Sequence, residues 1–163
     1  MTFFNCNNSY YRLAVASARD RRNKAIPAVR NFALTKNDNG KLSVDCSCFT
    51  SPEECVARVG ASIKGDGNYK NHLDREVYSI GAEFIAESEQ ILGVIYDPTI
   101  VDPPQKGKPQ NFSHCLLSLA VNDLSELEPE ICLKLREHAK ERRVSHDLAV
   151  TNSLVSTLRS QWA

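Results

Sequence analysis

Long apolar runs are missing from the sequence. No apolar stretch approaches the ~18 residues needed to cross a bilayer, and the first residues lack the basic leader and unbroken apolar segment of a signal peptide. We therefore expect a cytoplasmic protein that makes no contact with a membrane. In that compartment its six cysteines are expected to be reduced thiols.

Signature motifs of the common enzyme classes are missing too. The chain contains no P-loop, no dinucleotide fingerprint, no serine-hydrolase elbow and no zinc-protease helix. Simple assignments to those classes are therefore excluded, while catalysis by other arrangements stays open. The formal net charge is zero, so binding to nucleic acid or anionic lipid would need a local patch of charge. We expect no cofactor.

Length and composition indicate one globular domain. A chain of 163 residues is long enough to bury a core without disulfides or metals. Helix and strand patterns are interspersed, and the turn signals between early strands favour antiparallel pairing. We predict a single α+β domain over residues 1–163, with a mostly antiparallel or mixed central sheet and flanking helices.

Apolar spacing predicts the elements of the first quarter of the chain. Residues 1–28 are expected to contain a basic helix, because apolar side chains between 10 and 18 recur at helical intervals. Residues 29–34 and 42–46 are expected to be adjacent strands, because the Asn-Asp-Asn-Gly segment at 37–40 is a strong turn signal. Together these two segments predict a β-hairpin.

Helix-start signals are clearest at Ser51, where serine is followed by proline and two glutamates. Ser51 would be the N-cap, Pro52 would occupy the first helical position, and Glu54 would complete a capping box. Further helices are predicted after the acidic stretch 123–130 and over residues 145–163, the latter as a peripheral element.

Two compact apolar runs predict the middle of the sheet. Residues 91–96 and 112–121 are expected to be buried strands that lie side by side. The proline-rich segment between them, residues 98–111, is expected to be an exposed loop.

Three charged or titratable residues form a candidate catalytic group. His114 follows the 98–111 loop, where an imidazole could act as general acid or base. Arg75 could hold a phosphate or carboxylate through its planar guanidinium, and Glu83 adds a carboxylate. The alternative is a structural His114 that hydrogen-bonds a neighbouring loop carbonyl, with Arg75 and Glu83 on a solvated surface.

Three cysteines allow a metal site as a less favoured interpretation. Cys46 and Cys48 lie two residues apart on a predicted strand, and Cys55 follows in the first turn of the next helix. Three thiolates could bind zinc, but the spacing departs from common zinc motifs. The favoured alternative is that Cys46 and Cys48 pack inward from one face of the strand while Cys55 begins the apolar stripe of the helix.

The most unbalanced charge lies in residues 12–30, which hold many basic residues and one acid. Arginines in this segment could contact the phosphates of a nucleic acid, or the segment could dock on the acidic 123–130 stretch or on a partner protein. A solvated helix face is the third alternative. The residues proposed for binding are Arg12, Arg19, Arg21, Arg22 and Lys24.

Several short motifs resemble pieces of a loosely defined group of small uncharacterised bacterial proteins. The shared pattern is F-x-L…G-L-S-V, a Pro/Glu/Cys helix start, V-x-x-D-P and H-[AC]-x-[IL]. It corresponds here to residues 32–34 with 40–44, 51–55, 94–98 and 114–119, with Lys41 inserted before Leu42. The resemblance spans residues 29–121. It implies a bacterial cytoplasmic origin and draws attention to His114, but it names no activity.

Three functions follow from these observations. The first is a non-catalytic accessory or interaction subunit of a bacterial cytoplasmic assembly, such as a mobile-element or phage-defence module, with a protein partner or self-association. The second is a small enzyme that acts on a nucleotide or nucleic acid through His114 and Arg75. The third is a nucleic-acid-binding module that uses the basic segment 12–30.

Overall fold

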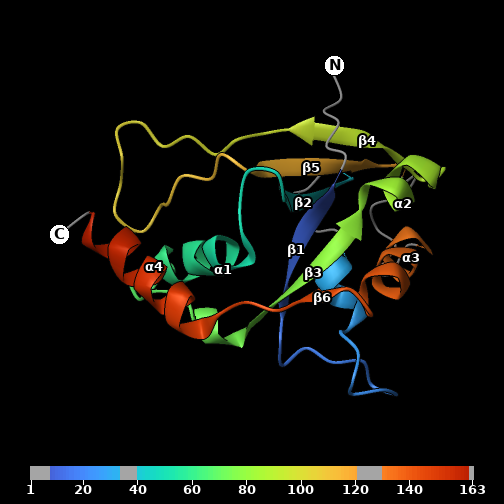
Figure 1. Cartoon of the computed structure of the whole chain (residues 1–163), viewed down its shortest axis with the longest axis horizontal. Coiled ribbons are helices and arrows are strands. Elements are labelled where there is room, and N and C mark those ends of the chain that lie inside the picture. Colours follow the sequence, from blue (N-terminus) through green and yellow to red (C-terminus); the bar gives the residue numbers. More distant parts are fainter. Residues whose placement is uncertain (1–7, 34–39, 121–129, 162–163) are drawn as a thin grey trace.

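The computed structural model describes residues 8–33, 40–120 and 130–161, in which one antiparallel sheet carries helices on both faces (Figure 1). The elements in chain order are β1 Ser9–Val15, η1 Val29–Phe32, β2 Lys41–Cys46, α1 Pro52–Ala61, η3 His72–Asp74, β3 Arg75–Gly81, α2 Ala82–Glu87, β4 Ile91–Tyr96, β5 His114–Leu119, α3 Glu130–Ala139, β6 Arg143–Val144 and α4 Leu148–Ser160.

The six strands lie in the order β4-β5-β2-β1-β3-β6, and every neighbouring pair is antiparallel. The predicted α+β class with a mostly antiparallel sheet is confirmed. The predicted neighbours also pair, because β4 runs beside β5 with Val94 opposite Leu117. None of the helices in the described residues is long and apolar enough to cross a membrane.

One face of the sheet holds the main core. Alternate residues of β1, β2, β3 and β5 point to this face, as the two-residue period of a strand requires. The short helix η1 and the helices α2 and α3 cover it. Phe32 of η1 is fully buried and meets the ring of Tyr78 edge-on at 6.3 Å between centroids.

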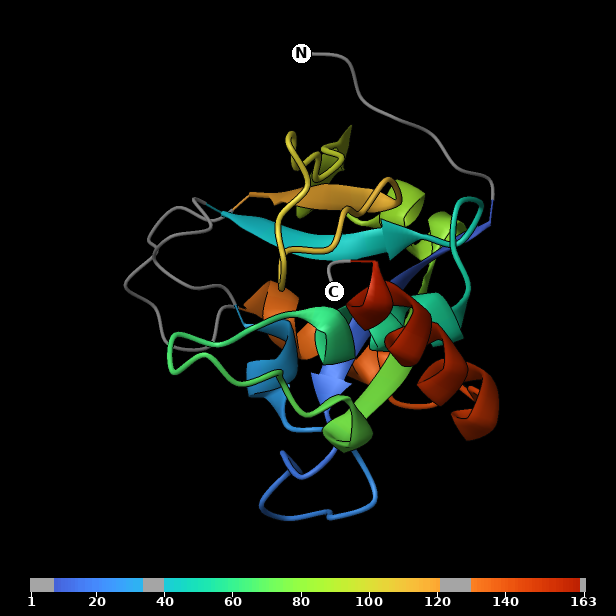
Figure 2. The same cartoon turned by 90° about the vertical axis from the view of Figure 1, so that its left-hand side faces the viewer.

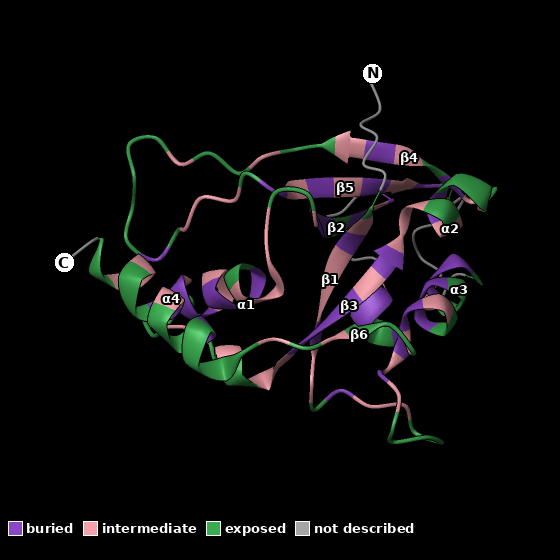
Figure 3. Ribbon diagram, viewed as in Figure 1, coloured by how far each residue is buried: buried purple, intermediate pink, exposed green. Residues whose placement is uncertain are grey.

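The opposite face is covered by α1, and α4 packs on the outside of α1. Val56 of α1 and Thr151 and Val155 of α4 are buried in this second layer. Figure 3 shows the buried residues of α4 on its α1 side and exposed residues on the other. The predicted C-terminal helix therefore forms, as an outer layer, whereas Trp162 lies outside the described residues.

The prediction of a basic N-terminal helix is wrong. Residues 9–15 form β1, a central strand that pairs with both β2 and β3. Tyr10 and Ala14 point into the main core and Arg12 lies between them on the same face. The apolar residues of this segment fit a helical period, but Tyr10 and Ala14 also fit the alternation of a strand. Hydrogen bonding to a neighbouring strand on each side favours the strand.

The predicted hairpin over residues 29–46 is wrong as well. Residues 29–32 form the 3-10 helix η1, whose i,i+3 pair Val29 and Phe32 faces the core. The strand over residues 42–46 is confirmed as β2, but it pairs with β1 and β5. The turn segment 37–39 lies outside the described residues.

The helix start at Ser51 is confirmed. Its Oγ accepts a hydrogen bond from Glu54 N at 3.1 Å, and Pro52 is the first helical residue. The Glu54 carboxylate accepts from Thr50 Oγ1 at 3.2 Å, one residue earlier than the capping box predicts. The cap fixes the direction of α1 and thereby the position of Arg58 on its inner side.

The 91–96 run is a strand that is buried on one face only. Ile91 and Val94 belong to the core, whereas Leu92 and Tyr96 are exposed, because β4 is the edge of the sheet. The loop that follows runs back to the sheet past α1, as the yellow segment of Figure 2 shows. Thr99 and Asn111 exchange two backbone hydrogen bonds at its base, of 2.8 and 2.9 Å.

Candidate anion-binding hollow

The chain between β1 and η1 forms a closed loop rather than a helix. Ala28 N donates to Ala18 O at 2.9 Å, and Asp20 N donates to Ile26 O at 3.1 Å. These two bonds make residues 18–28 a ribbon that projects beyond the end of β1, at the bottom of Figure 1. The basic residues of the sequence segment are therefore presented from a loop with a defined shape.

Asp20 organises the tip of this loop. Its Oδ1 accepts hydrogen bonds from Arg22 N at 2.9 Å and Asn23 N at 3.0 Å, an Asx-type turn. Its Oδ2 accepts from Arg136 Nη1 of α3 at 3.0 Å. The hydrogen bond from Arg136 and those from the two backbone amides hold the pKa of the Asp20 carboxyl below its ordinary value.

Asn31 ties the loop to the sheet. Its Oδ1 accepts from Val15 N at 3.0 Å and its Nδ2 donates to Ala18 O at 3.2 Å. Asn31 is buried, so this side chain satisfies backbone groups that water does not reach. The loop is consequently held at both its entry and its exit.

The loop, η1 and α3 surround a hollow of about 740 Å³. Of its charged lining residues, six are cations and one is the carboxylate of Asp20. The cations are Arg19, Arg21, Arg22, Lys24, Arg30 and Arg136. We call this feature the cationic hollow.

Two of the six cations are already paired. Arg136 forms the ion pair with Asp20, and Arg19 forms an ion pair with Glu76 of β3. Glu76 is buried and also accepts from Tyr78 Oη at 2.5 Å. These pairs fix two guanidinium groups against the body of the protein, so carboxylates of the protein largely neutralise their charges.

The other four cations have no compensating partner among the described residues, and most of the acidic stretch 123–130, the alternative docking partner, lies outside those residues. Arg21, Arg22, Lys24 and Arg30 are exposed and form no ion pair with any residue in the described part of the chain. Their charges therefore add to a positive potential over a concave surface, where field lines from like charges reinforce one another. A chain with no net charge thus carries a local patch of one sign.

The structure gathers four of the five residues proposed for binding and leaves out the fifth. Arg12 lies on β1, where its Nε donates to Asn31 O at 2.9 Å and its Nη1 donates to Ser43 O at 2.8 Å. Arg30 and Arg136 join the hollow although the sequence did not single them out as site residues. For Arg136 no local signal exists, because it is 116 positions from Asp20 in the chain.

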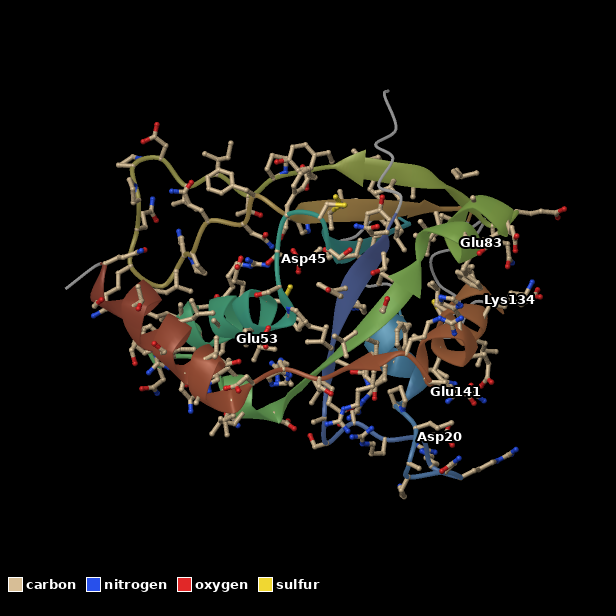
Figure 4. All side chains as sticks on the ribbon, viewed as in Figure 1. Asp20, Asp45, Glu53, Glu83, Lys134 and Glu141 are labelled. Atoms are coloured by element: carbon tan, nitrogen blue, oxygen red, sulfur yellow. The ribbon has the colours of Figure 1, made fainter. Side chains whose placement is uncertain are left out.

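The three residues of the catalytic hypothesis do not converge. His114 begins β5, and Arg75 begins β3, three strands along the sheet; at ~4.8 Å per strand they are ~14 Å apart across it alone. Glu83 lies in α2 beyond the opposite end of β3. Figure 4 shows Glu83 far from Asp45, the residue of β2 that lies opposite His114 in the sheet.

His114 has the contacts of the structural alternative. Its Nδ1 lies 2.6 Å from Asp97 O, so the ring donates to a neighbouring loop carbonyl, and its Nε2 lies 3.1 Å from Ser43 Oγ. Arg75 donates from Nη1 to the carbonyl of Asp74 at 2.9 Å. These contacts turn neither the His114 imidazole nor the Arg75 guanidinium toward the other residue.

The cysteines do not make a metal centre in the described residues, where no cluster of three His, Cys, Asp or Glu side chains could hold an ion. Cys46 and Cys55 are buried free thiols, as the favoured alternative predicts. Burial, above all, raises the pKa of Cys55 to about 12, so it is protonated and unreactive at neutral pH. Cys48 is exposed and disulfide-bonded, so the expectations of an inward-packed, reduced Cys48 are wrong.

Comparison of the chain with protein-family models, with curated proteins and with solved structures found no match. The resemblance to small bacterial proteins therefore stays a prediction, and the chemistry of the cationic hollow carries the functional argument. That chemistry is a group of exposed arginine and lysine side chains, most of them on a loop whose backbone is held by Asp20 and Asn31.

Proposed function

We propose that this protein binds nucleic acid through the phosphate backbone, using the cationic hollow. The observation that carries the proposal is the set of four cations on one concave surface that pair with no carboxylate in residues 8–33, 40–120 and 130–161. Arginine supplies three of the four, and its planar guanidinium matches phosphate oxygens with two parallel hydrogen bonds. The loop that presents them is held by Asp20 and Asn31, so little order has to be gained on binding.

The lining favours a nucleic acid over a protein partner. Six of the seven charged lining residues are cations, and a polyanion can meet several of them at once with successive phosphates. No aromatic side chain lines it in the described part of the chain, so bases have no stacking surface there. We therefore expect binding with little sequence preference.

Salt dependence gives a quantitative test. If each of the four uncompensated cations replaces one counterion on a single strand, the slope of log K against log salt is about −3. Affinity would then fall about 50-fold between about 50 and 200 mM salt. The measurement is the fluorescence anisotropy of a labelled single-stranded DNA of mixed sequence, titrated at several salt concentrations.

A loss-of-charge variant localises the binding. Replacing Arg21, Arg22 and Lys24 together by Ala leaves one uncompensated cation and should reduce the slope to about −0.7. The control is Lys106→Ala, an exposed cation on the 97–111 loop that should leave the slope unchanged. Absence of binding at low salt, or equal slopes for the triple variant and the unmodified protein, would contradict the proposal.

A gain-of-charge variant tests the same surface in the opposite direction. Asp20→Asn keeps an oxygen that accepts from the amides of Arg22 and Asn23 but removes the carboxylate of the hollow. Affinity should therefore rise, while the slope should change little because Arg136 keeps its ion pair with Glu137. Asp66→Asn is the matched control, because Asp66 forms the same kind of turn with Asn68 N at 2.9 Å, away from the hollow. Equal gains in affinity for both variants would show a non-specific effect of net charge.

The role of accessory subunit in a bacterial cytoplasmic assembly remains compatible with nucleic-acid binding. It is motivated by the missing enzyme motifs and by the segregation of basic and acidic residues into separate segments of the sequence. Co-purification of a tagged chain with its neighbours, with and without nuclease treatment, tests it. A partner that is lost on nuclease treatment would be bridged by nucleic acid rather than bound by the protein.

A further inference from the structure

A second cavity lies on the opposite face of the sheet from the cationic hollow. It is open to solvent, has a volume of about 440 Å³ and is lined by residues of α1, the end of β2 and the loop 97–111. Volumes of this size are typical of sites for small molecules. Its lining divides into a polar inner end, apolar walls and a basic rim.

The inner end is built around the buried carboxylate of Asp45. Its Oδ1 accepts from Asn111 Nδ2 at 2.6 Å and Ser113 Oγ at 3.0 Å, and lies 3.5 Å from Arg58 Nη2. A buried carboxylate with three partners is held in one position, as a recognition group has to be. Figure 4 shows Asp45 between β2 and α1.

Arg58 neutralises Asp45 and is itself held in place. Its Nη2 lies 3.2 Å from Thr50 Oγ1, 3.1 Å from Ser113 Oγ and 3.4 Å from Cys55 Sγ. Because one cation offsets one carboxylate, the inner end has no net charge. Arg58 Nη2 and Asp45 Oδ1 are engaged within the protein, whereas Arg58 Nη1 and Nε and Asp45 Oδ2 have no hydrogen-bond partner among the described residues. These remaining atoms are the donors and the acceptor that a ligand would meet.

The walls and the rim of the cavity differ from its inner end. The walls are apolar and include Val59 and Ile63 on one side and Val101 and Pro109 on the other. At the rim, Lys70 and Lys108 are exposed, and their side chains form no ion pair with any described residue. The rim therefore carries two positive charges next to an apolar slot.

We propose that this cavity binds a mononucleotide. A nucleobase edge carries both donors and acceptors, which is what Asp45 and Arg58 present together. The flat ring of the base would lie between the apolar walls, and the phosphate would reach the two rim lysines. This site is independent of the cationic hollow, since the two have no lining residue in common.

Titration calorimetry with AMP, GMP, CMP and UMP tests the proposal, with the four nucleosides and inorganic phosphate as partial ligands. At least one mononucleotide should bind, and it should bind at least about tenfold more tightly than its nucleoside or phosphate alone, because each part supplies only some of the contacts. Failure of all four mononucleotides to bind, or equal binding of phosphate alone, would overturn the proposal.

Two lysines of the same loop provide a matched pair of variants. Lys108→Ala should weaken the preferred mononucleotide about tenfold and leave the nucleoside unaffected, because only the phosphate contact is lost. Lys106→Ala changes the same charge two residues away, outside the lining, and should bind like the unmodified chain. Both lysines are exposed, so both variants should fold. Equal affinities of the two variants would place the nucleotide elsewhere and refute the assignment.

Discussion

The loop 97–111 is hydrogen-bonded to the segment that follows α1, and replacing Gly107 by Ala should break this contact. Ile63 N donates to Gly107 O at 3.1 Å, and the glycine has a φ of 74°. A Cβ at this position would lie 2.4 Å from Ile63 Cγ1 and 2.6 Å from Ile63 Cβ. The latter atom is next to the backbone, so the clash cannot be relieved by turning the end of a side chain.

Gly67 provides a control for the cost of a left-handed backbone without a side-chain clash. Its φ is 85°, and a Cβ there would meet no atom within 4 Å. Both glycine-to-alanine changes place a side chain in the left-handed region, at a cost of roughly 1 kcal/mol. Gly107→Ala adds an overpacking cost of about 1–3 kcal/mol, so its total should be about 2–4 kcal/mol against about 1 kcal/mol for Gly67→Ala.

Urea unfolding measures both changes in the free energy of unfolding, and hydrogen exchange shows where the strain is released. The Ile63 amide should lose protection in Gly107→Ala and keep it in Gly67→Ala. Adding Ile63→Ala to Gly107→Ala removes the clashes with Cγ1 and Cδ1 but keeps the one with Cβ. It should therefore recover only part of the overpacking cost, so the two substitutions should be non-additive by about 1 kcal/mol. Equal destabilisation by the two glycine variants, with the Ile63 amide protected in both, would refute the reasoning.

Two other predictions concern the opposite face of the sheet. Asn31→Ala removes a buried side chain that bonds two backbone groups and should cost about 2 kcal/mol in urea unfolding, without changing the secondary structure seen by circular dichroism. Burial, with a smaller effect from Arg142, lowers the pKa of His138 to about 4, while in the unfolded chain it is ~6.5. The unfolded state alone takes up this proton between those values, so stability should fall as pH drops from 6.5 to 5, by at most about 1.4 kcal/mol per pH unit. His138→Gln should flatten this part of the profile; an unchanged slope would show that another group is responsible.

The sequence predicts those parts of the fold that depend on local signals or on long uninterrupted patterns. Ser51 and Pro52 define a helix start by their own chemistry, and the structure has it there. The apolar runs at 91–96 and 112–121 could hardly be separated in a small sheet, and they pair as β4 and β5. That β4 is an edge strand was not visible, because edge position depends on the order of all six strands.

Residues 9–15 show where local patterns mislead. Their apolar positions satisfy a helical period, and alternation is interrupted because Arg12 points to the same face as Tyr10 and Ala14. The strand tolerates this arginine because its guanidinium reaches two backbone carbonyls, those of Asn31 and Ser43, from residues that are distant in the chain. A charged residue is acceptable there only after the fold has supplied its partners.

The cationic hollow is likewise predictable only in those parts that do not depend on distant residues. The cluster of basic residues after β1 is visible in the sequence, and the turn at Asp20 could be expected from its residue type. Which of those cations remain available for a ligand is decided by Glu76 and Arg136, since each forms an ion pair that joins the loop to another element. Counting charges along residues 12–30 therefore overstates the charge free to bind at Arg12 and Arg19 and misses the two pairs that hold the surface in shape. The segment predicted as a basic helix becomes the end of β1, a loop and η1, with two structural arginines, Arg12 and Arg19, and four cations for a ligand. Only the second set should respond to salt.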